Sequence, residues 1–180
     1  LINFLRLIKK PERKCFYFIS TMDVLKFKNY NLITPYILSK LASERLLVEY
    51  AKTTNLKVVI IRISSLYDKV YADNSRFISN ILKLAKKNKK IFLNKDINIC
   101  NYIDMKFVTN AIIKNVIKQP NKKVTILQIM NEKNISQNKI LEKIFKFHNY
   151  TKKPIILKKS KNFEINYKNI LQKKFDLKFN

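Results

Sequence analysis

The chain has 180 residues, of which 47% are hydrophobic, so it can form a packed core and is expected to be one domain or parts of two. It has no Gly and only two Cys, which excludes a Gly-rich phosphate-binding loop, a disulfide framework and a Cys-rich metal site. No apolar run reaches the roughly 18 residues of a membrane span, while the net charge of +26 raises the question of a nucleic-acid partner.

The first elements in chain order predict a parallel strand–helix–strand unit. Residues 2–10 carry apolar side chains at helical spacing, and 15–20 form a short apolar and aromatic run that is typical of a buried strand. Thr34 is suited to cap a helix over 35–53, because a Pro follows it at the first helical position. The apolar run 57–64 predicts a second buried strand. A helix of this length between two strands favours a right-handed parallel crossover.

Helices and strands continue to alternate after residue 67. The helices expected there are 76–90, 107–119, 136–148 (with Ser136 as its cap) and 167–174. The strands expected there are 91–93, 98–105, 124–130 and 154–157.

The positive charge comes mostly from lysine. Only five of the 38 basic residues are Arg, and the lysines are spread along the chain. Arg is the residue favoured for bidentate contacts to phosphates and bases, so this composition favours solvated surface lysines and disfavours a nucleic-acid partner. The opening segment LINFLRLIKK lacks a signal-peptide cleavage site, and with few Cys this predicts a reduced, cytoplasmic setting.

Tyr36 and Lys40 have the spacing of a catalytic pair, but spacing alone carries no information here. Composition predicts roughly 1.7 Tyr-x-x-x-Lys matches by chance, and two occur, the other being Tyr102 with Lys106. The position of the first pair is more specific. Ligands of open parallel sheets bind beyond the carboxyl ends of the strands, and the first turn of the connecting helix lies at that edge.

Hydroxyl groups gather at the same predicted edge. Ser20 and Thr21 follow the first strand, and Ser64 and Ser65 follow the second. A free tyrosine has a pKa near 10, and an ammonium one helical turn away favours the phenolate form. Tyr36 is therefore expected to take a proton from a substrate hydroxyl as hydride leaves the same carbon, while Thr21 holds the substrate oxygen.

Several segments, in order, resemble one enzyme family. FYFISTMDV, TPYILSKLASERLLVEYA and LKVVIIRISSLY resemble consecutive segments of the extended short-chain dehydrogenases/reductases, the NAD-dependent sugar-nucleotide epimerases and dehydratases. NYIDMKFVTNAI and VTILQIMNEKNISQNKILEKI resemble later family segments, so the match covers nearly the whole chain. The resemblance implies an α/β fold, with the C-terminal half of a Rossmann-like parallel sheet plus a small α/β substrate-binding domain.

The resemblance also implies a division of the chain. Residues 1–67 would form the C-terminal part of the NAD(P)-binding Rossmann domain. Residues 68–180 would mainly form the substrate-binding domain, with about 99–118 packing back on the Rossmann part. The family's Gly-rich loop lies well before the first strand seen here. The chain is therefore expected to be N-terminally truncated, to bind NAD or NADP weakly or not at all, and to be inactive by itself.

The family's functional residues can be placed on this sequence. The resemblance implies that Thr21 contacts the substrate hydroxyl and that Tyr36 is the acid/base. It implies that Lys40 tunes Tyr36 and binds the nicotinamide ribose. Ile63 would lie near the nicotinamide, and Ser65 would lie at the substrate mouth.

Other residues narrow the predicted class of reaction and the set of candidate site residues. Dehydratases of this family carry Asp-Glu directly after the Thr, whereas Met22 and Asp23 stand there in this chain. An epimerase or reductase acting on a nucleotide sugar is therefore favoured over a dehydratase. Glu44 and Glu49 are expected to be surface charges, and the lone His148 is expected to be a surface or core residue rather than a ligand.

Partners and alternatives complete the prediction. The resemblance implies a homodimer formed through helices 2–10 and 35–53, with no metal. A second hypothesis, motivated by the charge, is a basic nucleic-acid or acidic-surface binding module on a decayed enzyme scaffold. A third is a remnant with no activity.

Overall fold

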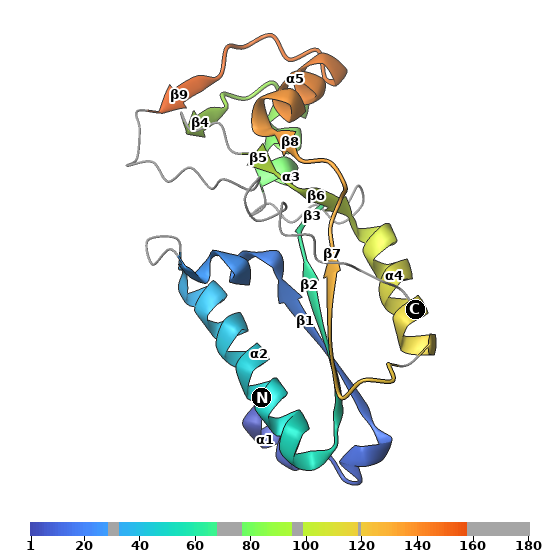
Figure 1. Cartoon of the computed structure of the whole chain (residues 1–180). Coiled ribbons are helices and arrows are strands. Elements are labelled where there is room, and N and C mark those ends of the chain that lie inside the picture. The colour runs from blue at the N-terminus through green and yellow to red at the C-terminus, as the bar shows by residue number, and fades with distance from the viewer. Residues whose placement is uncertain (29–32, 68–76, 95–98, 119, 158–180) are drawn as a thin grey trace. The chain divides into compact units, whose positions relative to one another are not determined.

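The chain is divided between two compact units. The first unit comprises Leu1–Asp68 and Tyr102–Glu132, and the second comprises Lys69–Asn101 and Lys133–Asn180. Each unit is therefore built from two separate stretches of sequence. The computed structural model describes residues 1–28, 33–67, 77–94, 99–118 and 120–157 (Figure 1).

A three-stranded parallel sheet forms the centre of the first unit. Its strands are β1 (Cys15–Thr21), β2 (Lys57–Ile63) and β7 (Val124–Ile129), in the order β1-β2-β7. Thr21 lies opposite Ile63 in the register of β1 and β2. Because all three strands run in the same direction, their carboxyl ends share one edge. The predicted parallel strand–helix–strand unit is confirmed.

Apolar side chains pack on both faces of this sheet, with α2 and α4 on opposite sides (Figure 1). The cluster beneath α1 (Ile2–Arg6) and α2 (Pro35–Thr54) has the buried members Leu5, Leu47, Ala51, Leu56, Val58 and Ile60. The cluster beneath α4 (Met105–Lys118) has the buried members Val59, Ile61, Ile63, Ile103, Val108 and Ile129. Neighbouring strand residues point to opposite faces, so the apolar run Val58–Ile61 of β2 is buried on both.

The helix α2 begins where the sequence predicts. Thr34 is its N-cap, and the Thr34 Oγ1 accepts a hydrogen bond from the Ile37 backbone N–H at 3.2 Å. Pro35 occupies the first turn, where a missing N–H removes no helical hydrogen bond. The helix ends at Asn55, whose φ of 59° is left-handed. Asn adopts this conformation more readily than other residues with a side chain.

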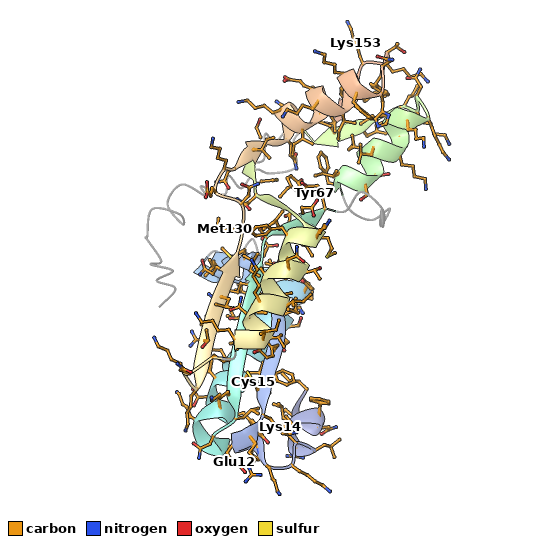
Figure 2. The ribbon with its side chains drawn as sticks, turned by 90° about the vertical axis from the view of Figure 1, so that its right-hand side faces the viewer. Glu12, Lys14, Cys15, Tyr67, Met130 and Lys153 are labelled. Atoms are coloured by element: carbon orange, nitrogen blue, oxygen red, sulfur yellow. The ribbon has the colours of Figure 1, made fainter. Side chains whose placement is uncertain are left out.

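A short parallel pair extends the carboxyl end of the first unit. β3 (Ser65–Tyr67) pairs with β6 (Tyr102–Asp104), and β6 leads directly into α4. Figure 2 shows Tyr67 and Met130 toward one end of this unit and Lys14 and Cys15 toward the other. None of the helices in the described ranges is long and apolar enough to cross a membrane.

The second unit contains two helices and two pairs of strands. The helices are α3 (Phe77–Lys86) and α5 (Gln137–Phe147). The pairs are parallel β4 (Phe92–Asn94) with β9 (Ile155–Leu157) and antiparallel β5 (Ile99–Cys100) with β8 (Ile135–Ser136). The buried residues of its core are Ile81, Ala85, Ile91, Leu141 and Ile144.

An asparagine with a left-handed backbone follows each helix of the second unit. Asn88 and Asn149 have φ values of 46° and 49°, in the left-handed region that Gly commonly takes at helix ends. After α5, the Tyr150 N–H donates to the Phe145 carbonyl at 2.9 Å, and the two rings stack with centroids 4.6 Å apart. This hydrogen bond and its apolar contact are those of a Schellman motif.

Several predicted elements have different bounds in the structure. The helices predicted over 76–90 and 107–119 are Phe77–Lys86 and Met105–Lys118. The helix predicted over 2–10 ends at Arg6, and Lys10 takes a left-handed φ of 51° immediately before Pro11. A residue that precedes proline is disfavoured in the helical region. The strand predicted over 98–105 divides into β5 and β6, which pair with different partners.

The segment after β1 contains the short 3-10 helix η2 (Met22–Lys28). The helix predicted over 167–174 lies outside the described residues.

Candidate active site

Three of the predicted site residues lie at the carboxyl edge of the central sheet. Thr21 ends β1 and Ile63 ends β2, and the two are register partners. Ser65 begins β3 and is exposed, whereas Ile63 is buried in the cluster beneath α4. The structure thus brings Thr21 and Ile63 side by side, with Ser65 just beyond them, at the edge where open parallel sheets bind ligands.

Tyr36 and Lys40 lie one helical turn apart at the start of α2. The Lys40 Nζ donates a hydrogen bond to the Ile19 backbone oxygen at 2.9 Å, two residues before Thr21. The same ammonium lies 5.0 Å from the ring centre of Phe18 and 5.8 Å from that of Tyr36. A cation over an aromatic face is attracted to it. Tyr36 is 56% exposed, so a ligand can reach it from solvent.

The Thr21 hydroxyl holds the turn that follows β1. Its Oγ1 accepts a hydrogen bond from the Asp23 backbone N–H at 3.2 Å, where η2 begins. A hydroxyl has one donor and two acceptor positions. The O–H of Thr21 can therefore still donate to a ligand oxygen while the turn is kept.

Ser64 has a buried hydroxyl at the same edge. Within the described residues, its Oγ has no hydrogen-bond partner. The Ser64 backbone N–H donates to the Ile129 carbonyl at 3.1 Å, which ties the end of β2 to the end of β7. A buried polar group without a partner costs about 1–3 kcal/mol, so this position favours a ligand or water that can supply one.

Glu44 is buried, so the prediction of a surface charge at this position is wrong. The Arg62 Nε lies 3.1 and 3.2 Å from the two Glu44 carboxylate oxygens, and its Nη2 lies 2.6 Å from Oε2. The Ser20 hydroxyl donates to Glu44 Oε1 at 2.5 Å. These three residues are called the Ser20–Glu44–Arg62 cluster below. Glu49 is exposed, as predicted, and pairs with Lys52 at 2.8 Å.

Two signals in the sequence point toward this cluster. Arg62 interrupts the apolar run KVVIIRI of β2, and a charge in a buried strand requires a partner. Glu44 lies four residues after Lys40, so helical spacing alone turns it toward the same side as Lys40. The two signals are separated along the chain, and only folding joins them.

Comparison with known families decides the broader identity. Residues 3–106 match the family described as the NAD dependent epimerase/dehydratase family. The chain belongs to this family. The fold class predicted for this epimerase/dehydratase-family chain is confirmed, because the central sheet is parallel and has helices on both faces.

Solved structures similar to this epimerase/dehydratase-family chain share its fold at low sequence identity. The dTDP-glucose 4,6-dehydratase from Bacillus anthracis, in complex with NAD, has a TM-score of 0.75 and 21% identity and covers 95% of this chain. The UDP-glucose 4-epimerase from Thermotoga maritima, with UDP-glucose, has a TM-score of 0.68 and 17% identity and covers 83% of this chain. The UDP-N-acetylglucosamine 4-epimerase from Methanobrevibacter ruminantium has a TM-score of 0.70 and 16% identity and covers 84%.

The chain spans only part of these proteins. It covers 58% of the dehydratase, 52% of the UDP-glucose epimerase and 52% of the UDP-N-acetylglucosamine epimerase. A comparison with curated proteins gave no match.

The described part of this family member contains no group of three or more His, Cys, Asp and Glu residues that could hold a metal ion. The ring of His148, which was predicted not to be a ligand, packs edge-on against Phe147 with centroids 4.9 Å apart.

Proposed function

We propose that this chain is part of a NAD(P)-dependent enzyme that acts on a nucleotide sugar, with Tyr36 and Lys40 as its acid/base pair. The observation that carries the proposal is the placement of Lys40. Its ammonium lies at the Ile19 carbonyl, beside the end of β1 and one turn from the exposed Tyr36. The names of the solved relatives, which act on nucleotide sugars, support the class of substrate.

Each side chain then has a role in proton transfer. The Tyr36 phenol oxygen takes a proton from a substrate hydroxyl and returns it, which is the task of a general base and acid. Lys40 places a positive charge 5.8 Å from the centre of the Tyr36 ring. The Thr21 hydroxyl donates to the substrate oxygen, and Ser65 contacts the sugar. When bound, the nicotinamide of the cofactor supplies hydride exchange.

The residues present fit one end of that cofactor. Lys40 and Tyr36 would contact the nicotinamide ribose, and Ile63 would contact the nicotinamide ring. The unpaired Ser64 hydroxyl at this edge is a further polar group that could face a ligand. The residues present do not fit the diphosphate end of the cofactor in this way. The chain contains no Gly with which to build the usual phosphate-binding loop.

The proposal also assigns cofactor binding and sugar binding to different parts of the chain. Residues 1–67 contribute the C-terminal part of the cofactor-binding Rossmann domain, and 68–180 mainly contribute the sugar-binding domain, with about 99–118 returning to the Rossmann part. Met22 and Asp23 follow Thr21 where a dehydratase would carry Asp-Glu, so epimerase or reductase chemistry is favoured.

Two calorimetric titrations of this chain test the proposal. With NAD or NADP, no saturable binding is expected at micromolar concentrations, and micromolar affinity would refute the loss of the phosphate site. With UDP-glucose and dTDP-glucose, saturable binding to one of them is expected, and Ser65→Ala should weaken it. Absence of binding to any nucleotide sugar, while the chain remains folded, would contradict the proposed substrate class.

A second candidate function, the binding of an anionic polymer, is favoured by the charge of the second unit. Its described residues include a single acidic side chain, Glu142. The lysines of the same ranges are Lys83, Lys86, Lys87, Lys89, Lys90, Lys133, Lys139, Lys143, Lys146, Lys152 and Lys153. Contacts of Asn88 with Thr151 at 3.2 Å, and of the Tyr150 hydroxyl with the Lys89 carbonyl at 3.0 Å, bring two groups of these lysines together.

Charge-matched variants distinguish this function from the behaviour of any polycation. Replacing Lys87, Lys89, Lys90 and Lys152 by Gln should abolish binding of a single-stranded oligonucleotide at physiological salt. The control replaces four first-unit lysines, Lys9, Lys10, Lys14 and Lys122, and changes the net charge by the same amount. Equal losses in both variants would show that binding depends on net charge alone.

A further inference from the structure

The face of α2 that meets the sheet carries two charged residues. Ile37, Leu47 and Ala51 are buried on this face, and Lys40 and Glu44 occupy intervening positions at helical spacing. Glu44 is only 3% exposed. Burying a carboxylate is costly unless it is paired and hydrogen-bonded. A buried ion pair adds little net stability compared with apolar side chains of similar size, so its presence on this face points to a positional role.

The Ser20–Glu44–Arg62 cluster lies one residue before the predicted catalytic edge. Ser20 and Arg62 are register partners on β1 and β2, and the next pair along these strands is Thr21 with Ile63. Glu44 binds Ser20 and Arg62 at the same time. One carboxylate on α2 is therefore fixed to the carboxyl ends of two strands.

Apolar packing alone does not define the rotation of α2 about its axis. Hydrophobic contact is non-directional, and α2 also carries apolar residues on its outer side, such as Leu38, which is 55% exposed. A bidentate Arg–carboxylate pair, in contrast, fixes the plane of the carboxylate. Through this plane, Arg62 and Glu44 restrict the direction in which the side chains of α2 point.

We propose that Glu44 and Arg62 are positioning residues for the Tyr36–Lys40 pair. They hold α2 in the rotation that keeps the Lys40 ammonium at the Ile19 carbonyl and over the Phe18 ring. The catalytic meaning of this placement rests on the function proposed above. The placement itself can be measured in the chain without cofactor or substrate.

The test follows the Lys40 side chain by NMR in the isotopically labelled chain, with Lys40→Arg used to assign its signals. Wild type should show nuclear Overhauser contacts between the Lys40 side chain and the Phe18 ring. It should also show ring-current shifts of the Lys40 ε-protons. In Glu44→Leu/Arg62→Met, apolar groups of similar volume replace the ion pair and should keep the fold. The Lys40–Phe18 contacts should then be lost, and the Lys40 shifts should approach those of exposed lysines.

Glu49→Gln is the matched control on the same helix, because Glu49 is exposed and pairs only within α2. This variant should keep the Lys40–Phe18 contacts unchanged. If the double variant is folded and keeps those contacts too, Glu44 and Arg62 have no positioning role. If the double variant does not fold, Arg62→Lys provides the same measurement with a smaller change, because a lysine keeps the positive charge but not the bidentate pair with Glu44. Unchanged Lys40–Phe18 contacts in that folded variant would equally overturn the proposal. Failure of nucleotide-sugar binding would affect the proposed function but not this result.

Discussion

The Tyr17 hydroxyl donates a hydrogen bond to the Asn115 backbone oxygen at 3.1 Å and so joins β1 to α4. Tyr17 also packs against the cluster beneath α4, on the side of the sheet opposite α2. Burial raises the pKa of Tyr17 to about 12, and a hydrogen bond with Cys15 acts in the same direction. Both effects favour the neutral phenol over the phenolate.

This shift makes stability depend on pH in the alkaline range. An unfolded tyrosine has a pKa near 10, so the neutral Tyr17 contributes its full stabilisation below about pH 10, and that contribution is lost as pH rises toward 12. Tyr17→Phe cannot ionise and should lack this component. Chemical denaturation of both proteins from about pH 9 to about pH 12 should show a steeper fall in the free energy of unfolding for wild type. Parallel curves would contradict the raised pKa of Tyr17.

Replacing Glu44 by Gln should strongly destabilise the chain. The substitution leaves the largely buried Arg62 without its counter-charge, and breaking a buried pair in this way typically costs about 3–5 kcal/mol. Glu49→Gln on the same helix breaks an exposed pair and should cost less than about 1 kcal/mol. Urea denaturation measures both free energies of unfolding. Equal losses would show that the Glu44 pair is not isolated from solvent.

Removing the N-cap should loosen the helix start that carries Tyr36. Thr34→Ala deletes the oxygen that accepts from the Ile37 N–H and should cost about 1 kcal/mol. Hydrogen exchange should speed up at the Ile37 amide in particular. The control is Ser39→Ala, which removes an exposed hydroxyl that donates to the Tyr36 carbonyl at 2.8 Å. Exchange of the Ile37 amide should be little changed in this control.

The core beneath α2 should be sensitive to shortened side chains. Leu47 is fully buried, and Leu47→Ala should cost about 2–5 kcal/mol because it leaves a cavity. Leu38 lies on the same helix but is exposed, so Leu38→Ala should change stability by less than about 0.5 kcal/mol. Thermal unfolding compares the two. A similar loss from both would place α2 in a different rotation from the one described.

The predicted homodimer can be tested at α1. This short helix exposes Phe4 and the adjacent Leu7, and an apolar hollow between α1 and α2 is lined by residues that include Ile2 and Leu46. If helices α1 and α2 form the dimer interface, Phe4→Asp should convert the protein to a monomer in sedimentation experiments. Ile117→Asp adds the same charge at an exposed apolar position of α4 and should leave the dimer intact. A monomeric wild type would contradict the predicted homodimer.

Local signals explain how much of the fold was predictable. α2 was predicted well because its cap, its Pro and its length agree, and β2 because an apolar run of its length has few other interpretations. The strand predicted over 98–105 failed for a non-local reason. Its two halves pair with β8 and with β3, which the local sequence does not reveal. The helix predicted over 2–10 cannot include Lys10, whose backbone is left-handed.

In the candidate site, too, the features set by local sequence were predictable and those set by distant residues were not. The positions of Tyr36 and Lys40 on one side of a helix follow from their spacing, and the position of Thr21 follows from the end of a strand. The burial of Glu44 does not follow from any local pattern in the sequence. It depends on Arg62, which is 18 residues away along the chain and on another element. The burial of the Ser64 hydroxyl likewise cannot be predicted from the sequence, because it depends on how the folded chain places the end of β2 beside the end of β7.

Asparagines at or just after the ends of α2, α3 and α5 take a left-handed backbone, at Asn55, Asn88 and Asn149. Glycine is the usual residue for such turns, and this chain has none. Asn adopts this conformation more readily than most residues with a side chain, whereas a β-branched residue is strained there. The three helix ends are therefore formed without glycine, at positions that accept few other side chains.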